Sequence, residues 1–150
     1  MNLSIQLYGK QVKSRCSERH TVIVSKEKKN GRCHCAINDE GRIVFQAKLD
    51  KDVFPNSCCC DFLVLETEGK RALFIELKGR DVNHALEQLD CAATNLRADL
   101  VGYTFHMRVI CSGTPHALKN TPTYLRFVKK HSKPVISTTM RYEERLSDLF

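Results

Sequence analysis

The chain has 150 residues, of which 42% are hydrophobic, so it can form one domain with a buried core but is too short for two of ordinary size. Its formal net charge of +7 would attract nucleic acid, although ribosomal and heparin-binding proteins share such a charge. No segment has the apolar length of a signal peptide or a membrane span, which predicts a soluble, cytoplasmic protein without a membrane partner. The eight cysteines are therefore expected to stay reduced.

The first part of the chain predicts short strands. The first thirty residues are polar and basic, and within them only residues 21–25 (TVIVS) are typical of a strand, which ends at the turn-prone sequence KKNG. From residue 33 to residue 50, the turn-forming sequence NDEG separates two moderately apolar runs, which predicts a β-hairpin. Residues 52–57 (DVFPNS) are expected to form a loop.

A dense apolar stretch follows. Residues 58–65 (CCCDFLVL) and 72–79 (ALFIELKG) predict two neighbouring buried strands joined by a tight turn. After Gly79 the apolar period changes from two to about 3.6, which indicates a helix with Asp81 as its N-cap. The apolar positions of this helix share one face: Val82, Ala85, Leu86, Leu89, Ala92, Ala93 and Leu96.

The C-terminal part predicts a strand, a helix and a strand. Residues 101–111 alternate between apolar odd positions and mostly polar even positions, which is strand periodicity. Thr121 and Pro122 are typical of a helix start, and residues 123–131 continue as a basic helix. Residues 135–138 (VIST) predict a last strand. The expected fold class is α/β, a single domain with a mixed central β-sheet flanked by helices.

One charged pattern stands out from its surroundings. The pattern Glu-x-Lys occurs three times, at Glu27/Lys29, Glu68/Lys70 and Glu76/Lys78. The first two lie in polar, turn-like segments. In the third, strand alternation puts both charged side chains on one face and Ile75 and Leu77 on the other. Desolvating a carboxylate and an ammonium in an apolar strand is costly, so either an internal ion pair or a functional site must explain them.

Asp61 favours the functional explanation. It lies in the adjacent predicted strand, so a second carboxylate can approach Glu76 across the sheet. Two carboxylates held close together repel unless a cation joins them, and Mg²⁺ or Mn²⁺ suits such oxygen ligands. Such an ion can polarise a phosphoryl oxygen and activate a water, while Lys78 orients that water or stabilises the negative charge that develops. The expected chemistry is hydrolysis of a phosphodiester.

An Asp followed fifteen residues later by Glu-x-Lys at a strand end, and then by a helix, resembles the PD-(D/E)XK nuclease superfamily. The resemblance covers residues 58–111 and implies a restriction-endonuclease-like or Holliday-junction-resolvase-like fold for the whole chain. It also implies that Asp61 and Glu76 bind Mg²⁺ and that Lys78 assists the attacking water. Cys60 stands where the superfamily name has Pro, at a position that varies.

The same resemblance points to further site residues. Exonuclease-like branches carry a Gln in the helix after the catalytic strand, which implies a catalytic role for Gln88; a Gln beside a solvated helix face is the alternative. The Tyr that usually follows four residues later is Ala92 here. Many members also supply an acid from an earlier element, for which Asp50 and Glu18 are candidates. Asp50 is preferred because it ends a predicted strand.

The remaining motifs indicate weaker sites. The cysteines at 33, 35 and 58–60 do not have the spacing of a tetrahedral zinc site, so they are expected to pack as small apolar residues on strands. A positive patch that either grips phosphates or is simply solvated is formed by Arg126, Lys129, Lys130, His131 and Lys133. The tail RLSDLF resembles peptides that dock repair enzymes on sliding clamps, although an apolar tail more often packs on its own domain.

The sequence therefore predicts a Mg²⁺- or Mn²⁺-dependent nuclease that acts on DNA, in DNA repair or defence. Cutting both strands with one small domain usually calls for a homodimer. Two alternatives remain open at this point: a catalytically inactive nucleic-acid-binding subunit with the same fold, and a zinc-stabilised interaction protein. The choice between DNA and RNA, and between endonuclease and exonuclease action, is not decided by these patterns.

Overall fold

Short strands and three α-helices make up the chain in the computed structural model, which describes residues 1–29, 31–77, 80–113 and 117–149. In chain order the elements are β1 (Ser4–Leu7), β2 (Lys10–Lys13), β3 (Val22–Lys26), β4 (Cys33–Ile37), β5 (Val44–Lys48), α1 (Leu49–Asp52), β6 (Phe62–Glu66), β7 (Arg71–Leu77), α2 (Val82–Leu96), β8 (Thr104–Ile110), the 3₁₀ helix η1 (Leu118–Asn120), α3 (Pro122–Lys130), β9 (Val135–Ser137), β10 (Arg141–Arg145) and the 3₁₀ helix η2 (Leu146–Leu149).

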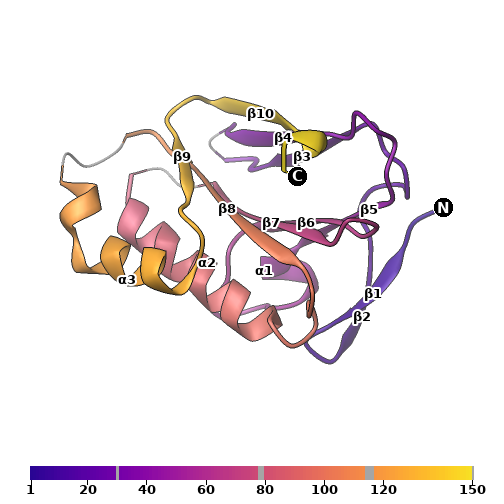
Figure 1. Cartoon of the computed structure of the whole chain (residues 1–150), viewed down its shortest axis with the longest axis horizontal. Coiled ribbons are helices and arrows are strands. Elements are labelled where there is room, and N and C mark those ends of the chain that lie inside the picture. Colours follow the sequence, from indigo (N-terminus) through magenta and orange to yellow (C-terminus); the bar gives the residue numbers. More distant parts are fainter. Residues whose placement is uncertain (30, 78–79, 114–116, 150) are drawn as a thin grey trace.

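A five-stranded sheet lies at the centre, in the order β5-β6-β7-β8-β9. β5, β6 and β7 run antiparallel, whereas β8 and β9 continue parallel to β7 because α2 and α3 provide the crossovers. The helices cover one face, and a three-stranded sheet, β10-β4-β3, covers the other (Figure 1). The predicted single-domain α/β class with a mixed central sheet is confirmed, but helices flank only one face of that sheet and not both. The second sheet was not predicted.

Strand alternation divides the core into two layers. On β7, Ala72 and Phe74 pack with the helices, whereas Leu73, Ile75 and Leu77 pack with the three-stranded sheet. The apolar stripe predicted for α2 is fully buried in the helix-side layer. Because each large apolar side chain contributes roughly 1.5–3 kcal/mol on burial, both faces of the central sheet are strongly held.

The helix starts lie where the sequence predicts them. Asp81 caps α2 by accepting the N–H of His84 at 3.0 Å, and the Thr121 hydroxyl accepts the N–H of Tyr124 at the start of α3 (3.3 Å). The strand predicted to begin at residue 101 is confirmed only from Thr104. Val101 is 75% exposed in the preceding turn, in which Gly102 has a φ of +86° that few other residues adopt.

The predicted hairpin over residues 33–50 is wrong. Its two strands exist as β4 and β5, but they belong to different sheets. Both edges of β4 are occupied, by β3 and by β10, while β5 pairs with β6. The connection is held by Asn38, whose side chain donates to Arg42 O (2.8 Å) and accepts from Arg42 N (2.9 Å). The sequence NDEG does form a turn, but this turn connects the three-stranded sheet to the central sheet and not two paired strands.

Three strands were missed, and a second strand besides β8 was predicted too long. β1, β2 and β10 are short and largely exposed, so they have no clear apolar alternation. Residues 58–60 were expected to lie on a strand, but β6 begins only at Phe62. Cys59 and Cys60 are buried in the segment before that strand, and Cys58 is exposed.

Buried polar contacts join the two sheets. Arg108 on β8 donates from Nε to Glu144 Oε2 (2.8 Å) and from a terminal nitrogen to Glu144 Oε1 (3.0 Å). Glu144 lies on β10, and its Oε2 is also 2.6 Å from Nε2 of His34 on β4. Gln46 on β5 donates to the carbonyl oxygen of Val24 on β3 (2.9 Å). The three-stranded sheet is therefore fixed to the central sheet at two places.

Within the described ranges, no helix is both long and apolar enough to cross a membrane.

Candidate active site

The ends of β6 and β7 bring Asp61 and Glu76 together. Asp61 immediately precedes β6, whose first residue Phe62 pairs with Ile75, so Asp61 lies opposite Glu76 in the continued register. The Asp61 N–H donates to Glu76 Oε1 (3.1 Å), and the Leu77 N–H donates to Asp61 Oδ2 (2.8 Å). Each carboxylate is thus held by a backbone N–H from the other strand, which orients both at one end of the sheet.

Glu76 lies on the face of β7 opposite Ile75 and Leu77, as strand alternation predicted, and this is the face that the helices cover. Its neighbours Ile75 and Leu77 pack on the opposite face, and Glu76 itself is only 2% exposed. Lys78, the third predicted site residue, lies outside the described residues, so its place in the site stays a prediction.

An open cavity of about 650 Å³ lies above these two carboxylates. Its walls come from the turn after β3, the end of β5 with α1, the ends of β6 and β7, and α2. The lining residues are Glu27, Lys28, Lys29, Lys48, Asp50, Lys51, Asp61, Glu76, Leu77 and Gln88. Glu76 is buried while Lys28, Lys29 and Lys51 are exposed, as is Asp50, so the cavity has an acidic floor and a mainly basic rim.

The cavity perturbs the acidity of Asp61. The pKa of this carboxyl is raised from 3.8 to about 6, mainly by burial and also by the negative charges of Asp50 and Glu27. The N–H of Leu77 and the charge of Lys48 act in the opposite direction. Strongly shifted pKa values of this kind are concentrated at functional sites.

The donor set at this site fits Mg²⁺. Among the described residues, no three His, Cys, Asp or Glu side chains are grouped so as to hold a metal ion by themselves. Mg²⁺, however, is usually bound through one or two carboxylates, with waters and substrate phosphates completing its coordination. Asp61 and Glu76 supply two such carboxylates, in a cavity that is open to a phosphate.

The cysteines beside the site are poor metal ligands or nucleophiles. All eight are free. Burial raises the pKa of the Cys59 thiol to about 12, helped by the charges of Asp50, Glu76 and Asp61. Burial also raises the pKa of Cys60 well above its usual value. Since the thiolate is the reactive form, these residues act as packing groups around the carboxylates.

Of the further site residues that the resemblance suggested, some lie at the cavity and others do not. Gln88 and Asp50 both line the cavity, while Ala92 is fully buried in the core. Glu18 lies elsewhere: its carbonyl oxygen accepts the N–H of Val44 (2.7 Å). Glu27 lines the cavity, although its Glu-x-Lys segment was interpreted as an ordinary turn. No local signal distinguishes it, because only the packing of one sheet on the other brings it there.

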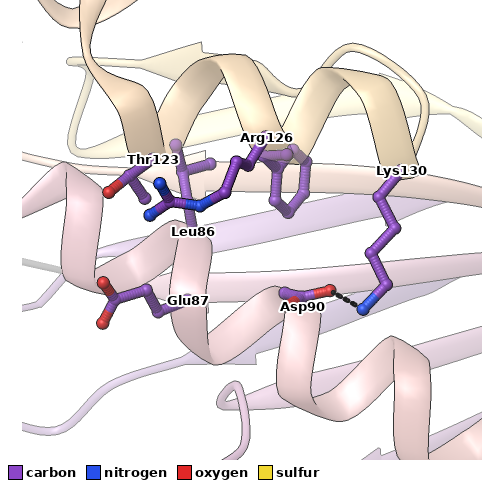
Figure 2. A pocket seen from close by; sticks show the side chains of 7 residues that line it. Leu86, Glu87, Asp90, Thr123, Arg126 and Lys130 are labelled. Carbon is purple, nitrogen blue, oxygen red and sulfur yellow. Dashed lines mark ion pairs between the residues drawn. The ribbon is translucent and has the colours of Figure 1, made fainter.

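A second hollow of about 310 Å³ lies between α2 and α3. Figure 2 shows Glu87 and Asp90 of α2 facing Arg126 and Lys130 of α3. Asp90 Oδ1 is 3.0 Å from Lys130 Nζ and 2.6 Å from His131 Nε2. His131 is also buried, with 1% of its side chain exposed. The predicted basic patch is therefore partly neutralised by α2.

The C-terminal tail packs on the protein itself. Leu146 is 2% exposed in the layer between the two sheets, and Leu149 packs against the same cluster. The Ser147 hydroxyl bonds to the Asp39 carboxylate. Phe150 lies outside the described residues, and docking of the tail on a sliding clamp stays a prediction.

No family model, curated protein or solved structure matched the chain when it was compared with known proteins. The functional argument therefore depends on the site itself.

Proposed function

We propose that the protein is a metal-dependent nuclease of the PD-(D/E)XK type, with DNA as the expected substrate and a restriction-endonuclease-like fold. One observation carries the proposal: the Glu76 carboxylate accepts the Asp61 N–H and the Asp61 carboxylate accepts the Leu77 N–H, which places both carboxylates at the floor of an open, lysine-rimmed cavity. Paired carboxylates below a basic rim suit a divalent cation and a phosphodiester together. The helix α2, which follows β7 directly and brings Gln88 to the cavity, agrees with the organisation that the resemblance implies.

Asp61 and Glu76 would hold the metal ion, which when bound supplies Lewis-acid chemistry toward the phosphodiester. The remaining groups act directly. Gln88 carries an amide that can orient a water or a phosphate oxygen by hydrogen bonding. Lys48 is half-buried at the cavity, with its Nζ 5.6 Å from the centre of the Phe62 ring, and its charge lowers the pKa of Asp61. It can therefore stabilise negative charge on a reacting phosphate, while Lys78 assists the attacking water, the role that the resemblance implies for it.

The test is a cleavage assay with Mg²⁺ or Mn²⁺ across single-stranded, duplex and branched DNA and the corresponding RNAs. Glu76→Gln keeps an oxygen for the Asp61 N–H but removes the negative charge. We expect it to lower the cleavage rate at least about a hundredfold without changing the fold. Glu68→Gln is the matched control, because Glu68 belongs to an exposed Glu-x-Lys pattern outside the cavity, and it should cleave as the parent does.

The predicted lysine is tested in the same assay by Lys78→Met, with Lys70→Met from the exposed pattern as its control. Equal cleavage by Glu76→Gln and the parent would overturn the proposal. An absence of cleavage with every metal and substrate, combined with salt-sensitive nucleic-acid binding, would instead favour the catalytically inactive binding subunit.

A further inference from the structure

The turn that follows β3 forms a wall of the cavity even though it belongs to the other sheet. Glu27, Lys28 and Lys29 line the same cavity as Asp61 and Glu76. The turn is closed by hydrogen bonds from the Glu27 N–H to Arg32 O (3.1 Å) and from the Gly31 N–H to Glu27 O (3.2 Å). The two lysines thus project from a closed hairpin turn of β3 and β4.

This wall is fixed to the body of the protein. Gln46, in the middle of β5, donates to Val24 O (2.9 Å) and to the Ser25 hydroxyl (3.1 Å), both in β3 just before the turn. Arg108 and Glu144 join the sheets again on the other side of β4. Because the strand that leads into the turn is held by buried contacts, less of the backbone has to be ordered when a ligand binds.

Most of the exposed charges around the cavity are positive. Lys28 and Lys29 of the turn and Lys51 of α1 are exposed at the rim, where Asp50 is also exposed, while Glu76 is buried at the floor. Exposed lysines at a rim can contact phosphates without repulsion from buried acids, provided that a cation neutralises the floor. A chain of phosphates crossing the rim would place one of them over the carboxylates.

We infer that the turn after β3 is a substrate-binding element, in which Lys28 and Lys29 grip the phosphates that flank the bond lying over Asp61 and Glu76. The inference rests on the proposed function, because it takes a nucleic-acid strand as the ligand. The three-stranded sheet then forms one wall of the substrate cleft, and α1 with Lys51 forms another.

The helix α3 offers the competing surface for phosphates. Its Lys129, together with Lys133 beyond its end, is exposed and lines none of the described cavities. Lys130 is excluded from this surface because it pairs with Asp90. Lys129 and Lys133 therefore form a matched control pair, with the same change in charge at a place away from the carboxylates.

The experiment measures binding of fluorescently labelled single-stranded DNA, duplex DNA and RNA by anisotropy in the Glu76→Gln background, over a range of salt concentrations. Lys28→Ala/Lys29→Ala should weaken binding about tenfold or more, and should reduce the slope of log K against log salt by roughly 0.9 for each lost phosphate contact on duplex DNA. Lys129→Ala/Lys133→Ala should leave both quantities nearly unchanged. Lys28→Arg/Lys29→Arg, which keeps both charges, should bind as the parent does.

Unchanged binding by Lys28→Ala/Lys29→Ala, or a larger loss with the α3 pair, overturns this inference even if the parent cleaves. Conversely, if the parent cleaves nothing but the Lys28→Ala/Lys29→Ala substitutions weaken nucleic-acid binding, the proposed nuclease activity is refuted. The proposed binding role of the turn is then retained. The two proposals therefore fail separately.

Discussion

Asp61 is the residue at which burial and charge conflict most directly. Its pKa of about 6 reflects burial first, and then the neighbouring Asp50 and Glu27. Relative to the ordinary value of 3.8, the folded state binds more protons between about pH 4 and pH 6. Stability therefore falls as the pH rises through this range, and the loss persists above it. A bound cation would remove the conflict by compensating the negative charge.

Removing that charge should stabilise the metal-free protein at neutral pH. We predict that Asp61→Asn, which keeps an oxygen for the Leu77 N–H, raises the free energy of unfolding by roughly 1–3 kcal/mol at pH 8 and has little effect at pH 4. Thermal or urea unfolding at both values measures this. Added Mg²⁺ should stabilise the parent but not the variant. A destabilised Asp61→Asn protein at pH 8 without metal would contradict the assignment of strain to this carboxylate.

The approach of Asp61 to Glu76 could be predicted from the sequence, because two apolar runs joined by a short turn have little choice of partner. Strand alternation then decided which face of β7 carries Glu76. Glu27 could not be found in this way. Its local sequence is a polar turn like that around Glu68, and only the position of the three-stranded sheet makes the two different.

At the scale of elements, α2 connects the core to the site. Its apolar stripe packs on the central sheet, and Gln88 extends from the border of that stripe into the cavity. The helix begins at Val82, where the Asp81 carboxylate satisfies the N–H of His84. The start of the helix lies only a few residues after Glu76.

We predict that Asp81→Ala lowers the free energy of unfolding by about 1 kcal/mol, because it leaves the first turn of α2 without its side-chain acceptor. Asp81→Asn retains such an acceptor and should lose only a few tenths of that amount. Denaturant unfolding of the two variants provides the measurement. If both variants lose the same stability, the charge of Asp81 rather than its hydrogen bond to His84 supports the helix.

The error in the predicted 33–50 hairpin also belongs to this scale. The turn signal at residues 38–41 is genuine, but turn residues specify a change of direction and not a pairing partner. β4 is taken by β3 and β10, and β10 follows it by about a hundred residues. Such a parallel pairing leaves no local mark on β10, whose side chains are largely polar and exposed.

At the scale of the whole molecule, the buried group of Arg108, Glu144 and His34 holds the two sheets together. Burial alone would raise the pKa of Glu144, but the hydrogen bonds from His34 and Arg108 prevail and lower it from 4.5 to about 2. This group therefore stabilises the fold fully above about pH 4.5, and its contribution is lost as the pH falls toward 2.

Breaking this group should be far more costly than breaking an exposed pair. We predict that Arg108→Met lowers the free energy of unfolding by about 3–5 kcal/mol, because Glu144 would stay buried without its bidentate partner. Arg145→Met is the control: Arg145 lies on the same strand as Glu144 and pairs with Asp148 at 3.5 Å, with both side chains mostly exposed, so its loss should cost less than about 1 kcal/mol. If both variants lose a similar free energy of unfolding, the buried contact of Arg108 with Glu144 is no stronger than the exposed pair of Arg145 with Asp148.

The sequence by itself determined the elements whose signals are local: the paired strands β6 and β7, the helices α2 and α3 with their caps, and the two facing carboxylates. These depend on periodicity, turn residues and capping groups within a few positions of one another. Only the tertiary structure decided that β3, β4 and β10 form a second sheet and that its turn carries Glu27, Lys28 and Lys29 to the cavity. Contacts between residues far apart in the chain depend on which surfaces bury each other, and no short pattern records that choice.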